Sequence, residues 1–259
     1  MNFSDRFQPA KKRFPLVSLY LFVCAILLIW DKPALALPTL QLDIGGGTYD
    51  LTTETIVSSG DSFTLYALLK PNLKNTLSDT YYISAALSPM VSDGTDLGSF
   101  QFNGSTIDVT GDMVYGVPPL EQILELQGWD SGDLPKHGIY PTYFAEFEFQ
   151  FSSANRATGY NTQDDAGQGP IDDPSGALYY AAFVVDLSDL SPGYSIHFDL
   201  YNTKLKNGGD IDVTQFAPFS HDAEARRTEQ VPGPSTLLLL GSGLIGLGLW
   251  KRNMRGTGK

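Results

Sequence analysis

Residues 143–151 have the sequence Tyr-Phe-Ala-Glu-Phe-Glu-Phe-Gln-Phe, whose alternation of apolar and polar residues from Ala145 onward predicts a β-strand. Successive side chains of a strand point to opposite faces of its sheet, so this segment would have one apolar and one largely polar face. The apolar face would carry Tyr143, Ala145, Phe147, Phe149 and Phe151, and the other face Phe144, Glu146, Glu148 and Gln150. We therefore expect a sheet with one face in a hydrophobic core and the other in contact with water.

The same pattern recurs on both sides of this segment. Further strands are predicted at Thr39 to Ile44, Ser62 to Leu69, Thr80 to Leu87, Ser105 to Thr110 and Tyr194 to Tyr201. Leu178 to Leu187 is apolar on both faces until Asp186, which is typical of a central strand covered on both sides. Turn residues separate these runs too often for a helical domain, and a single short helix is expected at Pro119 to Gln127. The predicted fold is all-β: an antiparallel β-sandwich of jelly-roll or immunoglobulin-like kind.

Residues 1–36 have the features of a secretory signal peptide. Basic residues precede an apolar core at Leu16 to Trp30, and small residues follow it at Ala34 and Ala36. Cleavage by signal peptidase is expected after Ala36, following passage through the secretion machinery. Cys24, the one cysteine of the chain, lies inside this segment, so the mature protein would have no disulfide.

The C-terminal residues combine a proline motif, an apolar run and a basic tail. The motif is Val231, Pro232, Gly233, Pro234 and Ser235, and the segment 231–250 contains 20 residues, about 30 Å as a helix. Lys251, Arg252 and Arg255 follow at once and would stay on the cytoplasmic side. The domain organisation expected is a signal peptide (1–36), an exported domain (37–230), a proline motif with a transmembrane sorting helix (231–250) and a basic cytoplasmic tail (251–259).

This proline motif, apolar helix and basic tail resemble the PEP-CTERM sorting signal of Gram-negative bacteria. The resemblance departs at one position, because Gly233 stands where the family usually has glutamate. It implies recognition by exosortase, a membrane protease, and then display in the cell envelope or extracellular matrix. A second run, Pro218-Phe219-Ser220-His221-Asp222-Ala223, with Leu200-Tyr201 upstream, is similar to exported proteins of the choice-of-anchor type, which implies a structural or adhesive role.

The predicted exported domain is strongly acidic. Residues 37–230 contain 27 acidic and 8 basic residues, a net charge near −19. Such a charge repels phosphate backbones, which excludes nucleic-acid binding, and it favours solubility and cation binding. Four aspartates, Asp164, Asp165, Asp172 and Asp173, lie in a loop rich in glycine and proline, where Ca²⁺ could bind with help from Asp210 and Asp212. The spacing matches no EF-hand, and a solvated loop is the other interpretation.

Enzyme chemistry is not predicted. Glu146 and Glu148 would project from one strand face with roots about 6.5–7 Å apart, in the range of a glycosidase pair. We favour the wet face of an amphipathic strand as the explanation, because every half-exposed strand produces such pairs. The histidines are His137, His197 and His221, and His197 would share a polar strand face with Ser195 and Asp199. Ser220-His221-Asp222 names triad residues, yet consecutive side chains project apart. Gly45-Gly46-Gly47 is expected to form a turn or bulge.

Two functions remain open. One is a non-catalytic protein of the envelope or matrix, held first in the inner membrane with its domain outside the cytoplasm. The alternative is a secreted carbohydrate-binding or carbohydrate-active protein with the same sorting signal, acting on extracellular polysaccharide. Trp129, beside Tyr140 and Tyr143, could stack on a sugar ring or pack over the end of the sandwich. No cofactor other than Ca²⁺ is suggested.

Overall fold

The computed structural model describes residues 37–58, 60–120, 138–205 and 211–227, together with residues 242, 244 and 245. The predicted signal peptide (1–36), the proline motif and the basic tail (251–259) lie outside these residues, as does most of the predicted helix at 119–127. Within the described part, no helix has both the length and the apolar character needed to cross a membrane.

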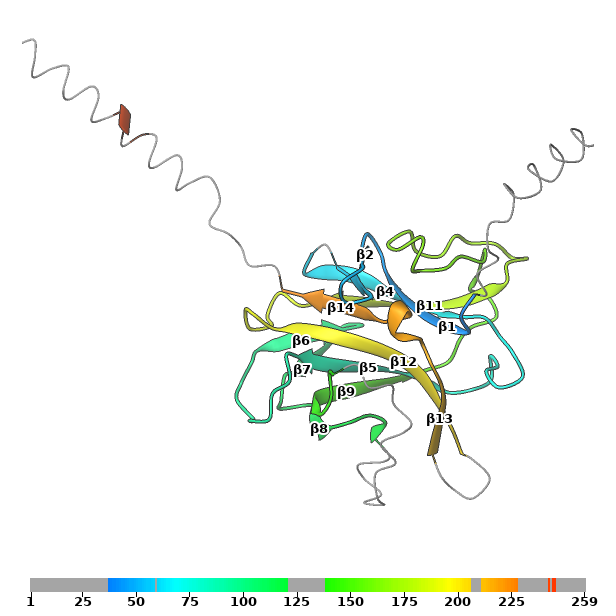
Figure 1. Cartoon of the computed structure of the whole chain (residues 1–259), viewed down its shortest axis with the longest axis horizontal. Helices are drawn as coiled ribbons and strands as arrows, with labels where there is room; N and C mark the ends of the chain where they lie inside the picture. Colours follow the sequence, from blue (N-terminus) through cyan, green and yellow to red (C-terminus); the bar gives the residue numbers. More distant parts are fainter. Residues whose placement is uncertain are drawn as a thin grey trace, which may run out of the picture. The chain divides into compact units, whose positions relative to one another are not determined.

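The described chain is built from β-strands, which confirms the predicted all-β class (Figure 1). A single 3₁₀ turn, η1 (Phe219–His221), interrupts them in the described residues. The strands are β1 (Leu40–Ile44), β2 (Thr48–Asp50), β3 (Thr55–Val57), β4 (Ser62–Leu69), β5 (Tyr81–Ser88), β6 (Ser99–Phe102), β7 (Ser105–Asp108), β8 (Val114–Gly116), β9 (Thr142–Phe149), β10 (Arg156–Ala157), β11 (Leu178–Asp186), β12 (Ser195–Leu205), β13 (Ile211–Phe216) and β14 (Ala223–Arg226).

These strands form two sheets. The six-stranded sheet has the order β1-β4-β11-β6-β7, with β10 beside β11. The eight-stranded sheet has the order β2-β3-β14-β12-β5-β9-β8, with β13 beside β12. Figure 1 shows the long strand β12 between β14 and β5. The expectation of antiparallel pairing holds except between β3 and β14, which run parallel with Ala223 opposite Ile56.

One hydrophobic core lies between the two sheets. It contains Leu40, Leu42 and Leu65 from the six-stranded sheet and Ile83 and Phe198 from the eight-stranded sheet, all fully buried. The apolar face predicted for residues 143–151 also packs here: the ring of Phe147 in β9 stacks on that of Phe102 in β6, with centroids 3.8 Å apart. Alternate apolar residues therefore hold the layers together, as their pattern predicted.

Two expectations about the outer faces are wrong. Strand β11 is central in its sheet, but Val184 on its outer face is 59% exposed, so the strand is not covered on both sides. The outer face of β9, expected to be wet, is partly covered: Phe144 is buried and Glu146 is half-buried, while Glu148 is exposed. The outer face of the eight-stranded sheet thus carries a covered polar layer, whose members come from several strands.

Candidate functional site

A cluster of buried ionisable side chains lies on the outer face of the eight-stranded sheet. His197 and Asp199 belong to β12, and Asp222 directly precedes β14. The alternation of β12 explains their direction, because Ile196, Phe198 and Leu200 occupy the core and the residues between them point the other way. All three polar residues are less than 5% exposed, so the face expected to contact water here is closed.

The register of the strands brings these groups together. β14 pairs with β12 so that Glu224 lies opposite His197. The Nε2 atom of His197 is 3.4 Å from Asp199 Oδ1 and 3.4 Å from Asp222 Oδ2, and its Nδ1 atom is 4.0 Å from Glu224 Oε2. One imidazole thus contacts three carboxylates. Among the described residues, the set His197, Asp199 and Asp222 places one ligand atom from each within 4.8 Å of the others.

The electrostatics of the cluster are dominated by excess negative charge in a buried place. Burial disfavours the charged form of His197, but the three neighbouring carboxylates outweigh it and raise its pKa to about 9. Burial raises the pKa of Asp222 to about 8, against the attraction of His197 and together with repulsion from Asp199 and Glu224. Even with a protonated imidazole, three carboxylates would leave an excess of negative charge, so the site favours an added cation or proton.

Hydrogen bonds fix the orientation of two of the carboxylates. Tyr140 Oη donates to Asp199 Oδ2 at 2.6 Å, and Ser84 Oγ donates to the same oxygen at 3.4 Å. Burial and the charge of Asp199 raise the pKa of Tyr140 well above its ordinary value, so this hydroxyl stays a donor. Ser195 Oγ donates to Glu224 Oε1 at 2.7 Å. Asp199 Oδ1 and Glu224 Oε2 are thereby left directed toward His197.

A hollow of about 240 Å³ adjoins the cluster through Glu224. It is lined by Asp50, Thr53, Val57, Ser58, Glu224 and Arg226. Glu224 thus belongs both to the lining of this hollow and to the surroundings of His197.

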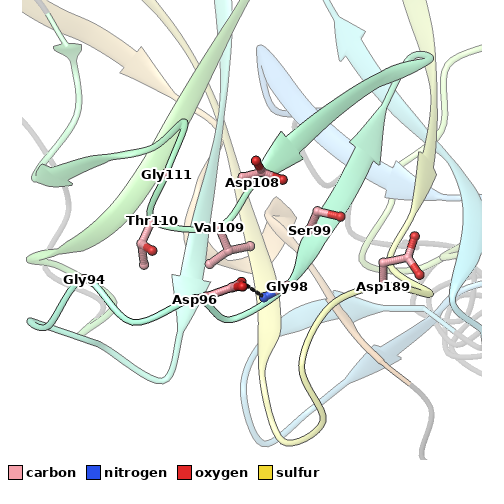
Figure 2. Close-up of a pocket in the computed structure, with 9 residues that line it drawn as sticks. All are labelled: Gly94, Asp96, Gly98, Ser99, Asp108, Val109, Thr110, Gly111 and Asp189. Carbon is pink, nitrogen blue, oxygen red and sulfur yellow. Dashed lines mark hydrogen bonds between the residues drawn. The ribbon is translucent and has the colours of Figure 1, made fainter.

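A larger hollow, of about 450 Å³, lies between the β5–β6 connection, the end of β7 and the turn after β11 (Figure 2). Its walls include the carboxylates of Asp96, Asp108 and Asp189. Asp96 Oδ1 accepts a hydrogen bond from the backbone amide of Gly98 at 2.9 Å. In the described part of the chain no three metal-ligating atoms converge in this hollow. It has the shape of a pocket but not the donor set of a metal site.

The four aspartates predicted for Ca²⁺ occupy the loop between β10 and β11. Asp164 and Asp165 are exposed and lie in a turn that hydrogen-bonds to Asn161. Asp172 accepts a hydrogen bond from the hydroxyl of Tyr180 at 2.7 Å, and Asp173 accepts one from the backbone amide of Ser175 at 2.8 Å. The hydrogen bond from the Ser175 hydroxyl lowers the pKa of Asp173. None of the four belongs to the set of converging ligand atoms found among the described residues. The calcium site stays a prediction.

The triplet Ser220-His221-Asp222 does not assemble a triad. Ser220 Oγ is 2.8 Å from His221 Nδ1, but His221 Nε2 contacts Asn161 Oδ1 at 2.7 Å, and Asp222 turns to His197 instead. The expectation that consecutive side chains diverge is confirmed for His221 and Asp222 but is wrong for Ser220 and His221, whose side chains are hydrogen-bonded. Burial lowers the pKa of His221 to about 4, so this ring is neutral at physiological pH.

Glu146 and Glu148 also differ in their surroundings. Glu146 Oε1 accepts the buried hydroxyl of Tyr201 and the amide of Leu120, the latter at 2.9 Å. Glu148 is exposed. Glu146 is therefore a structural acceptor at the covered end of the outer face.

Several predicted site residues lie outside the described residues. They are Trp129, His137 and Asp210, the cleavage alanines Ala34 and Ala36, the motif residues Val231, Pro232, Gly233, Pro234 and Ser235, and the basic residues Lys251, Arg252 and Arg255. Their assignments stay predictions.

Sequence reasoning placed His197 and Asp199 on one strand face but missed Asp222 and Glu224. A signal was present, since residues 222–225 read Asp-Ala-Glu-Ala, an alternation with two buried alanines. The pattern is only four residues long, so it does not reveal that β14 pairs with β12.

Comparison with known proteins confirms the C-terminal signal. Residues 230–252 match the family model of the PEP-CTERM protein-sorting motif, which covers less than a tenth of the chain. No curated protein sequence is significantly similar to the chain. One similar solved structure is a 35 kDa C-terminal fragment of the major pilin GBS80 of Streptococcus agalactiae, with 9% identity and a TM-score of 0.29. The alignment covers 74% of this chain but 56% of that one, little more than half its length, and it does not establish a shared function.

Proposed function

We propose that the protein is a non-catalytic component of the cell envelope or extracellular matrix. The observation that carries this proposal is the PEP-CTERM protein-sorting motif at residues 230–252, which supports export and a location in the envelope or at the cell surface. The motif also implies processing by exosortase-like membrane machinery. In this proposal the protein acts in the envelope or matrix, and its role there depends on the exported domain at residues 37–230.

The proposed route has three steps. Signal peptidase removes residues 1–36 after Ala36, and the domain at 37–230 emerges on the outer side of the inner membrane of a Gram-negative cell. The apolar residues up to 250 hold the chain in the membrane while Lys251 and Arg252 remain in the cytoplasm. An exosortase-like protease then acts near Pro232 to Pro234.

The non-catalytic role is supported by the chemistry of the described residues. His221 is held by Ser220 and Asn161 while its neighbour Asp222 contacts His197, so the triplet offers no nucleophile activated by a general base and an orienting acid. Glu146 is engaged by Tyr201. The groups best suited to catalysis by residue type thus hold the domain together.

The test is mass spectrometry of both mature termini of the protein recovered from its native cell. We expect an N-terminus at Leu37 and a C-terminus within or beside the proline motif. Deletion of 231–259, or the double change Pro232→Ala and Pro234→Ala, should abolish sorting, whereas Thr228→Ala, just before the motif, should not. Gly233→Glu, which restores the usual acidic residue, should be processed at least as efficiently as the natural chain.

An intact chain in a soluble intracellular fraction would overturn this proposal. Binding to envelope polysaccharide that Trp129→Ala removes would instead identify a carbohydrate-binding protein with the same sorting signal.

A further inference from the structure

Two of the three ligand–ligand distances in the buried cluster have the spacing of a four-coordinate metal site, and all three ligand atoms lie within 4.8 Å of one another. A tetrahedral ion with bonds of about 2.0–2.1 Å to nitrogen and oxygen separates its ligands by about 3.3–3.4 Å. His197 Nε2 lies 3.4 Å from Asp199 Oδ1 and 3.4 Å from Asp222 Oδ2. Both contacts are longer than a normal N–H···O hydrogen bond of about 2.7–3.2 Å, and the same nitrogen makes both of them. One proton on Nε2 can be directed well at only one of the two carboxylates at a time, whereas one metal ion can bind all three atoms.

A second, independent observation concerns Asp222. The residue is only 3% exposed, and its Oδ1 has no hydrogen bond of normal geometry, although the side chain of Thr55 lies beside the carboxylate and lowers its pKa. A buried carboxylate oxygen without a donor is costly, because the water it lost is not replaced. The other oxygen of the same carboxylate faces His197 Nε2. A cation bound to this carboxylate would compensate for both the lost water and the excess negative charge.

The surrounding residues have the arrangement that supports metal ligands. A metal-binding imidazole usually directs its second nitrogen to a carboxylate, which fixes the tautomer. Here Glu224 Oε2 faces His197 Nδ1, and Glu224 is itself held by Ser195 Oγ. Asp199 keeps Oδ1 toward His197 because Tyr140 donates to its Oδ2. The side chains that would bind the metal are therefore oriented by hydrogen bonds from neighbouring residues, as is usual in metal sites.

We propose that His197, Asp199 and Asp222 bind a divalent transition-metal ion of the zinc type, with Glu224 as a positioning residue. One imidazole nitrogen and two carboxylate oxygens suit Zn²⁺ better than Ca²⁺, which prefers six to eight oxygen ligands. The three protein ligands leave a fourth position for water. This site is distinct from the four aspartates of the β10–β11 loop.

The proposed ion would stabilise the fold by connecting two strands. It joins β12, in the middle of the eight-stranded sheet, to the residue that precedes β14, the strand after which the sorting motif begins at residue 230. The chain has a single cysteine, so no intrachain disulfide can close this connection. A metal ion bound only in the folded state stabilises that state in proportion to its affinity and concentration.

The experiment uses the full chain purified in detergent with a tag that contains no histidine, stripped with a chelator and then dialysed. Titration with Zn²⁺ followed by elemental analysis should give one bound ion per chain and a melting temperature several degrees higher, whereas Ca²⁺ and Mg²⁺ should not. Co²⁺ should give the intense visible bands of a four-coordinate ion with nitrogen and oxygen ligands. This spectrum needs no variant, so it tests the site even where a substitution prevents folding.

Three variants assign the ligands. His197→Gln and Asp222→Asn should each abolish stoichiometric Zn²⁺ binding, and Glu224→Gln should weaken it by about 10–100-fold. The matched control is Asp164→Asn, an exposed aspartate that should bind Zn²⁺ like the natural chain. Each variant is compared by circular dichroism without metal, so a loss of binding is separated from a loss of fold.

The proposal is overturned by less than stoichiometric Zn²⁺ with no change in melting temperature, or by a response to Ca²⁺ rather than Zn²⁺. It is equally overturned if folded Asp222→Asn binds Zn²⁺ unchanged. None of these outcomes affects the sorting proposal, which concerns residues 230–252 and is read from the mature termini.

Discussion

At the scale of single residues, the most constrained acidic side chain outside the histidine cluster is Asp43. It is fully buried within β1, and both of its carboxylate oxygens accept hydrogen bonds. Gly167 N donates to Oδ1 at 2.8 Å, and Gly169 N and Tyr160 Oη donate to Oδ2 at 3.0 and 3.2 Å. One carboxylate therefore fastens the β10–β11 loop to the six-stranded sheet.

Asp43→Asn should lower the free energy of unfolding by about 1–3 kcal/mol. The side-chain amide of asparagine carries an NH₂ group, and this donor would face one of the donors that Asp43 now accepts from. Urea denaturation measures the difference, with Asp164→Asn in the same loop as the control, because that exposed residue should change stability by less than about 0.5 kcal/mol. Equal stability of the Asp43→Asn and natural proteins would contradict this account.

The same residue predicts a pH dependence. Burial raises the pKa of Asp43 above 3.8, although its hydrogen bonds oppose the effect. Since the folded state then holds this proton more tightly than the unfolded chain, the contribution of Asp43 to stability is fully present at low pH and is lost as pH rises through the raised pKa. The difference between the natural protein and Asp43→Asn should therefore shrink from pH 4 to pH 7 in urea titrations. A difference that grows with pH would reverse the assigned direction.

At the scale of elements, the outer face of β9 separates two glutamates that the sequence presents as equivalent. Glu146→Ala should cost about 1–3 kcal/mol, because the buried hydroxyl of Tyr201 loses its acceptor. Glu148→Ala, two residues along on the same face, should change stability by less than about 0.5 kcal/mol. In a Tyr201→Phe background the cost of Glu146→Ala should fall, since no hydroxyl is left without a partner. Thermal denaturation of the natural protein and these four variants, the Tyr201→Phe single variant included, checks this, and equal costs for the two glutamates would contradict it.

These elements also show what a sequence can and cannot predict. Strand β4 occupies the residues predicted for it, 62–69, and β12 begins one residue after its predicted start, because alternation is a local property of the chain. The covered outer face was not predicted, because Tyr140 and Asp199 meet across 59 residues. The contact between Asp222 and His197 was not predicted for the same reason, because it depends on the pairing of β14 with β12 and not on spacing along the sequence.

At the scale of the whole molecule, the two sheets pack against one shared core, and the exported domain carries a large negative charge. Residues 37–230 have a net charge near −19, and the described domain must fold against this self-repulsion. Raising the ionic strength from 0.01 to 0.15 M shortens the screening length from about 30 to about 8 Å. Repulsion between distant carboxylates is then weakened more than the short contacts inside the fold.

We therefore expect the melting temperature of the metal-free protein at pH 7 to rise with added NaCl over this range. The control is the same titration near pH 4.5, the isoelectric point of the whole chain, where fewer carboxylates are ionised and the effect of salt should be smaller than at pH 7. Differential scanning calorimetry also reports whether one transition is present, as the shared core requires. A melting temperature that falls with salt at pH 7 would mean that favourable ion pairs outweigh the repulsion, and it would contradict this prediction.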